Sequence, residues 1–446
     1  MKSKIISRIL ISTFSFPLLS IAISNKACKG CNILKAFGIA ALSILILVGV
    51  TGASPFAYVT NYENNSVSVI DTAANTVKTT VNVGSGPRGV AFSPDGTRAY
   101  VANSCSNNIY VIDTVKNKVI DITHVGSFPL GIAVSPDGTK VYVGNAASNT
   151  ISVIDAATNN VAATVKVGNL PGDIAVAPNG KKVYAVISGE SPDYQGTVSI
   201  IDTATNNVTA TVNVERNPRG IAVSPDGTKV YVVSSNGYPC YNGTVSVIDT
   251  ATNTVTAAVP VGSLPQGIAV SPNGTKVYVA IENPGGYSGK GDIDVTSIEG
   301  AVDVIDASTD KVIATVSVGS IPLEVAVNLD GNEVYVVNEV NNTVSVIDTA
   351  TNKVNTTVHV GRGPVAVGIG PATKSSSTIE SNGTSLLNPI NRTGNQTNDT
   401  GMTANAGTAG KQERESISTK ASIPFLSPIW VLVAVLGTVA FVRKMK

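Results

Sequence analysis

Three short stretches near the start of the chain decide the fold: Tyr58-Val59-Thr60-Asn61, Ser66-Val-Ser-Val-Ile-Asp71 and Gly89-Val-Ala-Phe-Ser-Pro-Asp-Gly96. All three patterns return along the chain, at first every 42 residues. The period is marked by a Tyr that opens a Val-rich strand, by an Asp that ends the next strand, and by a Pro. These residues are Tyr58, Tyr100, Tyr142, Tyr184, Tyr231, Tyr278 and Tyr335; Asp71, Asp113, Asp155, Asp202, Asp249, Asp306 and Asp348; and Pro87, Pro129, Pro171, Pro218, Pro265, Pro322 and Pro364.

Each period predicts four short strands, named a to d in chain order. In one period they are Gly131–Ser135, Val141–Gly144, Thr150–Ile154 and Ala162–Val167. Ser-Pro-Asp-Gly at Ser135–Gly138 joins a to b, because Pro presets φ and Gly accepts a positive φ. Asp155 opens the turn from c to d, where its side chain can cap the backbone. A period of this length with four strands is typical of a propeller blade.

The strand count closes the ring. The chain begins with strands b, c and d over Ala57 to Val83, six complete sets follow, and a last a strand covers Val365 to Gly370. This gives 28 strands in seven blades. We therefore predict an all-β fold, a seven-bladed β-propeller of four-stranded antiparallel blades, closed by the C-terminal inner strand pairing with the N-terminal blade. Such closure removes exposed sheet edges.

Composition agrees with a many-stranded protein. Charged residues make up 14% and aromatic residues 5% of the chain, while Gly (41) and Pro (22) are frequent. The net charge is +1, so no basic field exists to attract nucleic acid, and we expect no nucleic-acid partner.

The N-terminal residues 1–53 read as a signal or leader region. Two apolar stretches, Ile9 to Ile23 and Phe37 to Val50, follow basic residues. The small residues Thr51 and Ala53 fit the cleavage rule of a secretory signal, and the alternative is an uncleaved membrane anchor. The propeller would then occupy residues 54–373.

The C-terminal part reads as a stalk and an anchor. Residues 374–421 form a linker rich in Ser, Thr and Asn that cannot bury a core. Four glycosylation sequons lie there within 19 residues, at Asn382, Asn391, Asn395 and Asn398. Within residues 422–446, Ile423–Val442 is long enough to span a bilayer, and the basic tail that begins at Arg443 favours the cytoplasmic side. We expect a membrane-anchored protein whose head lies outside the cell.

The repeat closely resembles the YVTN-type β-propeller repeats of archaeal surface-layer proteins, especially those of methanogens. The resemblance covers Ala57 to about Pro371. Those relatives are seven-bladed surface propellers with no established catalytic residues. The resemblance therefore implies a surface binding or coat role, with surface glycoproteins, polysaccharide or other cells as partners.

Few residues of the repeat suggest chemistry. His124 and His359 lie on the outermost strand, where other blades carry other polar residues, so a solvated face is expected. Cys105 and Cys240 belong to blades 2 and 5, too far apart for the short Cα separation that a disulfide needs, so we expect them unpaired. The seven repeated aspartates are explained as turn caps. We expect no metal and no cofactor.

Departures from the repeat indicate where a ligand would bind. Extra residues occur only between strands b and c of blades 4, 5 and 6, at Ser188–Gly196, Ser234–Gly243 and Ile281–Gly300. These insertions carry four tyrosines, Tyr194, Tyr238, Tyr241 and Tyr287. Tyrosines among small polar residues suit recognition of protein or sugar, and the alternative is neutral loop growth.

A second departure lies in strand a. The position two residues after the Pro is Gly or Ala in five blades but Asp173 and Glu324 in two. Arg88 and Arg219 add the opposite charge one position earlier. We expect these residues near the channel mouth, either as a small-ligand or ion site or as a polar lining with water.

The leading functional hypothesis is a binding, adhesion or coat-interaction module, without enzymatic activity. The alternative is a propeller enzyme of the lactonase or quinone-dependent dehydrogenase type, which would use the channel mouth. A purely structural coat component is a third possibility. Fold alone does not decide between them.

Overall fold

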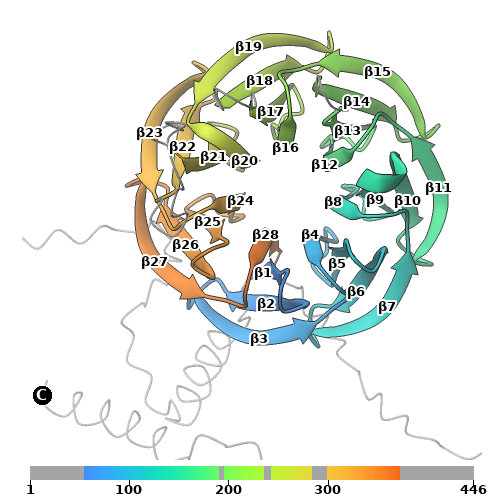
Figure 1. Cartoon of the computed structure of the whole chain (residues 1–446), viewed down its shortest axis with the longest axis horizontal. Helices are drawn as coiled ribbons and strands as arrows, with labels where there is room; N and C mark the ends of the chain where they lie inside the picture. The colour runs from blue at the N-terminus through green and yellow to red at the C-terminus, as the bar shows by residue number, and fades with distance from the viewer. Residues whose placement is uncertain (1–54, 190–194, 236–242, 284–298, 372–446) are drawn as a thin grey trace, which may run out of the picture. The chain divides into compact units, whose positions relative to one another are not determined.

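Seven four-stranded antiparallel sheets surround a central channel (Figure 1). The computed structural model describes residues 55–189, 195–235, 243–283 and 299–371. In each blade the strands follow one another from the channel to the rim, so strand a is innermost and strand d outermost. The predicted fold class, the number of strands and the number of blades are confirmed.

The strands have the following bounds. Blade 1 contains β28 (Pro364–Gly370), β1 (Phe56–Asn61), β2 (Ser66–Asp71) and β3 (Thr76–Asn82), and blade 2 contains β4 (Pro87–Phe92), β5 (Arg98–Asn103), β6 (Asn108–Asp113) and β7 (Lys118–His124). Blade 3 contains β8 (Pro129–Val134), β9 (Lys140–Asn145), β10 (Thr150–Asp155) and β11 (Asn160–Lys166), and blade 4 contains β12 (Pro171–Val176), β13 (Lys182–Ile187), β14 (Thr197–Asp202) and β15 (Asn207–Asn213). Blade 5 contains β16 (Pro218–Val223), β17 (Lys229–Ser235), β18 (Gly243–Asp249) and β19 (Thr254–Val261). Blade 6 contains β20 (Ser263–Val270), β21 (Lys276–Asn283), β22 (Ala301–Asp306) and β23 (Lys311–Ser317), and blade 7 contains β24 (Pro322–Val327), β25 (Glu333–Asn338), β26 (Thr343–Asp348) and β27 (Lys353–His359).

The inner strands begin earlier than the sequence predicts. Pro129 already pairs with Asn145 across the ladder, so β8 starts at the proline and not at Gly131. The ladder then shifts register before Ile132, which leaves the two residues between them in a bulge. A short 3₁₀ turn, η1 (Ala146–Ser148), also follows β9 and was not predicted.

The hydrophobic core lies between neighbouring blades. The repeated tyrosine of strand b is at most 1% exposed in every blade and packs against the next blade. Tyr184 of blade 4, for example, shares a cluster with Val230 and Ile248 of blade 5. Burying a ring of this size contributes more than any single Val or Ala here, so the tyrosines set the spacing of the blades.

Ring closure follows the same rule. Tyr335 of blade 7 packs in one cluster with Val59 and Val367 of blade 1. The last strand, β28, pairs with β1 in antiparallel register, with Phe56 opposite Gly370 and Thr60 opposite Ala366. The two ends of the repeat therefore form one sheet.

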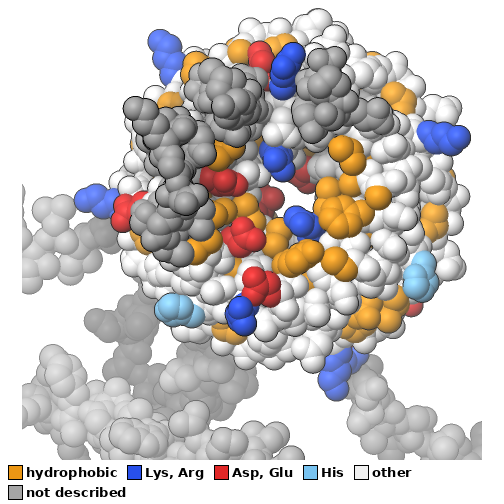
Figure 2. Space-filling view, viewed as in Figure 1, with side chains coloured by type: hydrophobic (Ala, Val, Ile, Leu, Met, Phe, Trp, Pro, Cys, Tyr) orange, Lys and Arg blue, Asp and Glu red, His pale blue; other side chains and the backbone are white. Residues whose placement is uncertain are grey.

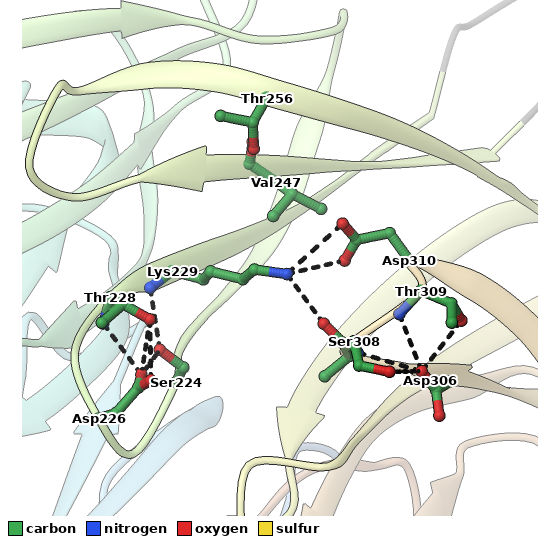
Figure 3. Close-up of polar contacts among 11 residues, drawn as sticks. Ser224, Asp226, Thr228, Lys229, Val247, Thr256, Asp306, Ser308, Thr309 and Asp310 are labelled. Carbon is green, nitrogen blue, oxygen red and sulfur yellow. Dashed lines mark hydrogen bonds and ion pairs between the residues drawn. The ribbon is translucent and has the colours of Figure 1, made fainter.

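The repeated aspartates cap turns, as predicted. In blade 6, Asp306 Oδ1 accepts hydrogen bonds from the backbone N–H groups of Ser308 and Thr309, at 3.1 and 2.9 Å (Figure 3). The same turn receives Lys229 from blade 5, whose Nζ donates to the Ala307 carbonyl at 2.8 Å and lies 3.1 Å from Asp310 Oδ1. This lysine latch links neighbouring blades on the face opposite to the loops between strands b and c.

Several sequence-based predictions lie outside the described residues. They are the leader region 1–53 with its boundary, the linker 374–421, the anchor 422–446, the sequons at Asn382, Asn391, Asn395 and Asn398, Cys240, and Tyr194, Tyr238, Tyr241 and Tyr287. Within the described part of the chain, no helix has the length and apolarity needed to cross a membrane.

Candidate functional site: the mouth of the channel

A pocket of about 440 Å³ lies at the mouth of the channel, on the face that carries the loops between strands b and c. It is lined by the first residues of the inner strands together with the loops that precede them. Figure 2 shows the hollow at the centre of the ring, with acidic and basic side chains around it and apolar side chains gathered on one side. The volume lies within the range of small-molecule sites.

The bulge in each inner strand explains which residues face this pocket. In β12 the register shifts between Pro171 and Ile174, so Gly172 and Asp173 leave the regular ladder. The bulges of β4 and β16 place Arg88 and Arg219 in the same way. Bulges re-aim side chains, and here they turn the residues after each proline towards the channel. All four charged residues predicted from the repeat, Arg88, Asp173, Arg219 and Glu324, line this one pocket.

Asp173 and Glu324 extend towards each other from blades 4 and 7. Asp173 Oδ1 accepts a hydrogen bond from its neighbour Ile174 N at 2.9 Å, and Oδ2 accepts one from Ile221 N of β16 at 3.2 Å. Glu324 Oε1 accepts one from Val325 N at 3.0 Å. The Glu324 carboxyl lies directly above Gly267 of β20, where any side chain would collide with it. The two carboxyls thus converge over the inner strands of blades 5 and 6.

Both carboxyls resist ionisation. Burial raises the pKa of Asp173 above its ordinary value. Burial, and then the neighbouring Asp173 charge, raise the pKa of Glu324. Within the described residues neither carboxyl forms an ion pair with Lys or Arg. The mouth therefore holds a carboxyl pair without a cationic partner, which favours a retained proton or a bound cation.

Arg88 lies on the other side of the mouth and is fixed by aromatic rings. Its Cζ atom is 5.0 Å from the ring centre of Tyr62 and 5.7 Å from that of Phe128. Its Nε atom is buried and donates no hydrogen bond within the described part of the chain. The Tyr62 hydroxyl in turn lies 3.4 Å from Cys105 Sγ. Arg88 is thus a preorganised guanidinium with one donor, Nε, that has no partner in the described residues.

Two further carboxyl groups, those of Glu282 and Glu339, interact with the arginines of the pocket. Gln266 Nε2 donates a hydrogen bond to Glu282 Oε1 at the end of β21. Burial raises the pKa of Glu282, and Gln266 and Arg219 partly offset the rise. Burial also raises the pKa of Glu339, and the charge of Arg88 opposes this rise. The rim is therefore electrostatically mixed.

Sequence reasoning missed the apolar wall of the pocket. Phe128 and Leu170, the residues before two of the prolines, are 38% and 43% exposed. Both have φ of 56°, a left-handed conformation that costs a bulky residue free energy. The amide N–H groups of these two residues donate to Asn107 Oδ1 and Asn149 Oδ1, which stabilises the strained loops. A signal was present, because two other blades have Gly at this position, Gly86 and Gly363.

The predictions for the cysteine and histidine side chains can be checked at three described residues, Cys105, His124 and His359. Cys105 is a free, exposed thiol, as expected. His124 and His359 are both exposed on the outermost strands, also as expected. The hydroxyl of Ser188, which lines the pocket, donates to the Pro218 carbonyl at 3.2 Å. In the described ranges no group of three or more His, Cys, Asp or Glu residues could hold a metal ion. The side chains that line the pocket offer carboxyl, guanidinium, amide and apolar groups.

Comparison with known proteins supports the fold and gives two partial family matches. Residues 174–321 match the model of the Choice-of-anchor I domain, and residues 58–191 match that of the Lactonase, 7-bladed beta-propeller family. Neither match reaches half of the chain. The first points to a role at the cell surface, and the second fits a seven-bladed propeller.

Two solved structures illustrate the similarity. Hydrazine synthase of Kuenenia stuttgartiensis is 22% identical with a TM-score of 0.58, over 63% of this chain and 88% of that one. A functionally unknown protein from Desulfotomaculum acetoxidans is 17% identical with a TM-score of 0.56, over 71% of this chain and 99% of that one. No curated protein sequence matches the chain. At these identities the likeness shows the fold alone: the chain is a seven-bladed β-propeller.

Proposed function

We propose that this protein is a cell-surface binding module whose propeller binds its ligand at the channel mouth. One observation carries the proposal. The inner strands depart from the repeat at four charged residues, and all four line a single pocket: Arg88, Asp173, Arg219 and Glu324. Random drift would scatter such departures along seven inner strands. The partial match to the Choice-of-anchor I domain supports the surface location.

The finer elements of the proposal come from the sequence. We propose a YVTN-type propeller related to archaeal surface-layer proteins, held at the membrane by residues 422–446 through a glycosylated stalk. Its partners would be surface glycoproteins, polysaccharide or other cells. The protein would act by binding or adhesion within the surface coat and would not be an enzyme.

A second candidate function is hydrolysis of a lactone. The match of residues 58–191 to the seven-bladed Lactonase family favours it, and a carboxyl with a raised pKa, such as Glu324, is suited to donate a proton. Against it, the serine hydroxyl in the pocket already donates to a backbone carbonyl, and histidine is not among the lining residues. Binding without turnover is therefore the better-supported function.

Crosslinking on intact cells tests the proposal. A membrane-impermeant crosslinker should join the head to a surface component, which mass spectrometry then identifies. If the head reacts only after the membrane is broken, the surface location is wrong. Steady release of acid from added lactones, with loss of that release in Glu324→Gln, would instead favour the enzyme.

A further inference from the structure

We propose that the channel mouth binds a small zwitterion with an apolar group, of which an apolar dipeptide with free termini is the simplest form. This inference rests on the proposed function and names the class of ligand. It follows from three features that line the same pocket: a carboxyl pair without a cation, a guanidinium without an anion, and an apolar wall beside that guanidinium.

The carboxyl pair would receive the ligand's ammonium group. Asp173 and Glu324 converge over the strands that carry Gly220 and Gly267, and within the described residues they accept hydrogen bonds only from three backbone N–H groups. The charged groups that flank them are Arg219 on β16 and Glu282 on β21. An ammonium has three donors and a compact charge, so it can bond both carboxyls at once.

The ligand's carboxylate would pair with Arg88. The rings of Tyr62 and Phe128 fix this guanidinium, whose buried Nε has no acceptor in the described part of the chain. A guanidinium presents a planar fork that matches a carboxylate in bidentate geometry. Glu339, the charged group that acts on Arg88 from blade 7, is itself reluctant to ionise. It therefore competes weakly for the arginine.

The apolar part of the ligand would pack on Phe128, Leu130 and Leu170. All three line the pocket, and the Phe128 ring lies against Arg88. Phe128 and Leu170 keep more than a third of their surface exposed. Both adopt a strained left-handed backbone conformation that places them there. Covering them with an apolar side chain removes their surface from water.

Binding of the ammonium carries a signature of its own. A cation next to Asp173 and Glu324 lowers the pKa of both carboxyls, which burial and mutual repulsion raise in the free protein. At pH 7 the ligand's amine is already protonated, so the complex expels a proton from the pocket. A ligand that only fills the apolar wall would expel none.

Titration calorimetry on the full chain at pH 7 tests this with three probes. They are leucyl-leucine, its N-acetyl derivative without the ammonium, and its amide without the carboxylate. We expect the zwitterion to bind at least about tenfold more tightly than either capped form. In two buffers of different ionisation enthalpy, only the zwitterion and the amide should show proton release. Equal affinity for all three probes, or no binding of any, overturns the inference.

Two variants assign the charges. Glu324→Gln should abolish the preference for leucyl-leucine over its N-acetyl form and reduce the proton release. Arg88→Gln, which copies Gln266 of blade 6, should abolish the preference over the amide. Asp137→Asn is the control, because Asn179 and Asn273 occupy the same turn position in other blades, and it should leave all affinities unchanged. Equal weakening of all three probes by either mouth variant contradicts the assignment.

The outcome also separates this inference from the function on which it rests. If no dipeptide binds but the crosslinked surface partner is retained, the zwitterion is wrong and the binding module stands. If both are absent, the module itself is contradicted.

Discussion

The mouth carboxyls should make the protein less stable as the pH rises, and Glu324→Gln should remove most of that effect. Burial and the Asp173 charge raise the pKa of Glu324 from its ordinary 4.5 to about 8. Between these values the folded state binds more protons than the unfolded state, so the free energy of unfolding falls as pH rises through this range. The destabilisation is absent below about pH 4 and complete above about pH 8.

The magnitude follows from the same numbers. One pKa unit corresponds to about 1.4 kcal/mol, so the rise to about 8 sets a ceiling of about 5 kcal/mol. Glu324 is only partly buried and lines the pocket at the channel mouth, where solvent screens its charge, so we expect about 1–3 kcal/mol. Glutamine keeps the oxygen that accepts from Val325 N and loses the charge.

Thermal unfolding of the full chain at pH 4, 7 and 9 measures this. The variant should melt with the wild type at pH 4 and roughly 2–5 °C above it at pH 9. Asp137→Asn is a control for which the effect on stability should have the opposite sign. Hydrogen bonds from Ser135 and Thr139 lower the pKa of Asp137, so its removal should cost stability at neutral pH and less in acid. Equal melting of Glu324→Gln and wild type at pH 9 would refute the argument.

Three further predictions concern the ring and the insertions. A chain that ends at Gly361 lacks β28, so the six residues of β1 that pair with it lose their partner strand. Its free energy of unfolding should fall by at least about 4 kcal/mol relative to a chain ending at Lys374. Equal melting temperatures of the two chains would contradict ring closure. Lys229→Met removes the latch to the Ala307 carbonyl and to Asp310 and should cost about 1 kcal/mol in a denaturant titration, less of it in high salt. Replacing residues 284–298 by a five-residue loop should abolish capture of the surface partner without moving the melting temperature, and unchanged capture would leave the insertion without a binding role.

The repeat made the fold predictable because each marker residue has the same local structural role in every blade. The buried tyrosine of strand b, the capping aspartate after strand c and the proline before strand a each recur seven times, so seven weak signals agree. Ring closure followed from counting the strands. The start of strand a was misplaced because Pro129 contributes to the ladder before the bulge at Gly131, and a bulge has no simple residue signature.

The site was predictable only in part. Asp173 and Glu324 in place of glycine were visible in the sequence, and both line the pocket. The bulge explains the direction of Asp173, whereas Glu324 pairs with Val337 in the ladder. The apolar wall was missed, because Phe128 and Leu170 do not themselves indicate a positive φ, and the only signal was Gly at the same position in two other blades, Gly86 and Gly363. Nor does the sequence reveal that Glu324 extends over Gly267, since that direction depends on which neighbour lacks a side chain. The predicted tyrosines of the insertions stay predictions.

The most direct test of binding at the channel mouth is to fill it. A side chain at Gly172 would begin in open space, since its Cβ meets only the Arg219 carbonyl at 3.9 Å, and the other six blades all carry a larger residue there. We therefore expect Gly172→Trp and the control Gly172→Ala to melt within about 2 °C of the wild type. The measurement is capture of the surface partner by the full chain: the account predicts capture by Gly172→Ala and none by Gly172→Trp. Undiminished capture by the well-folded Trp variant would contradict it.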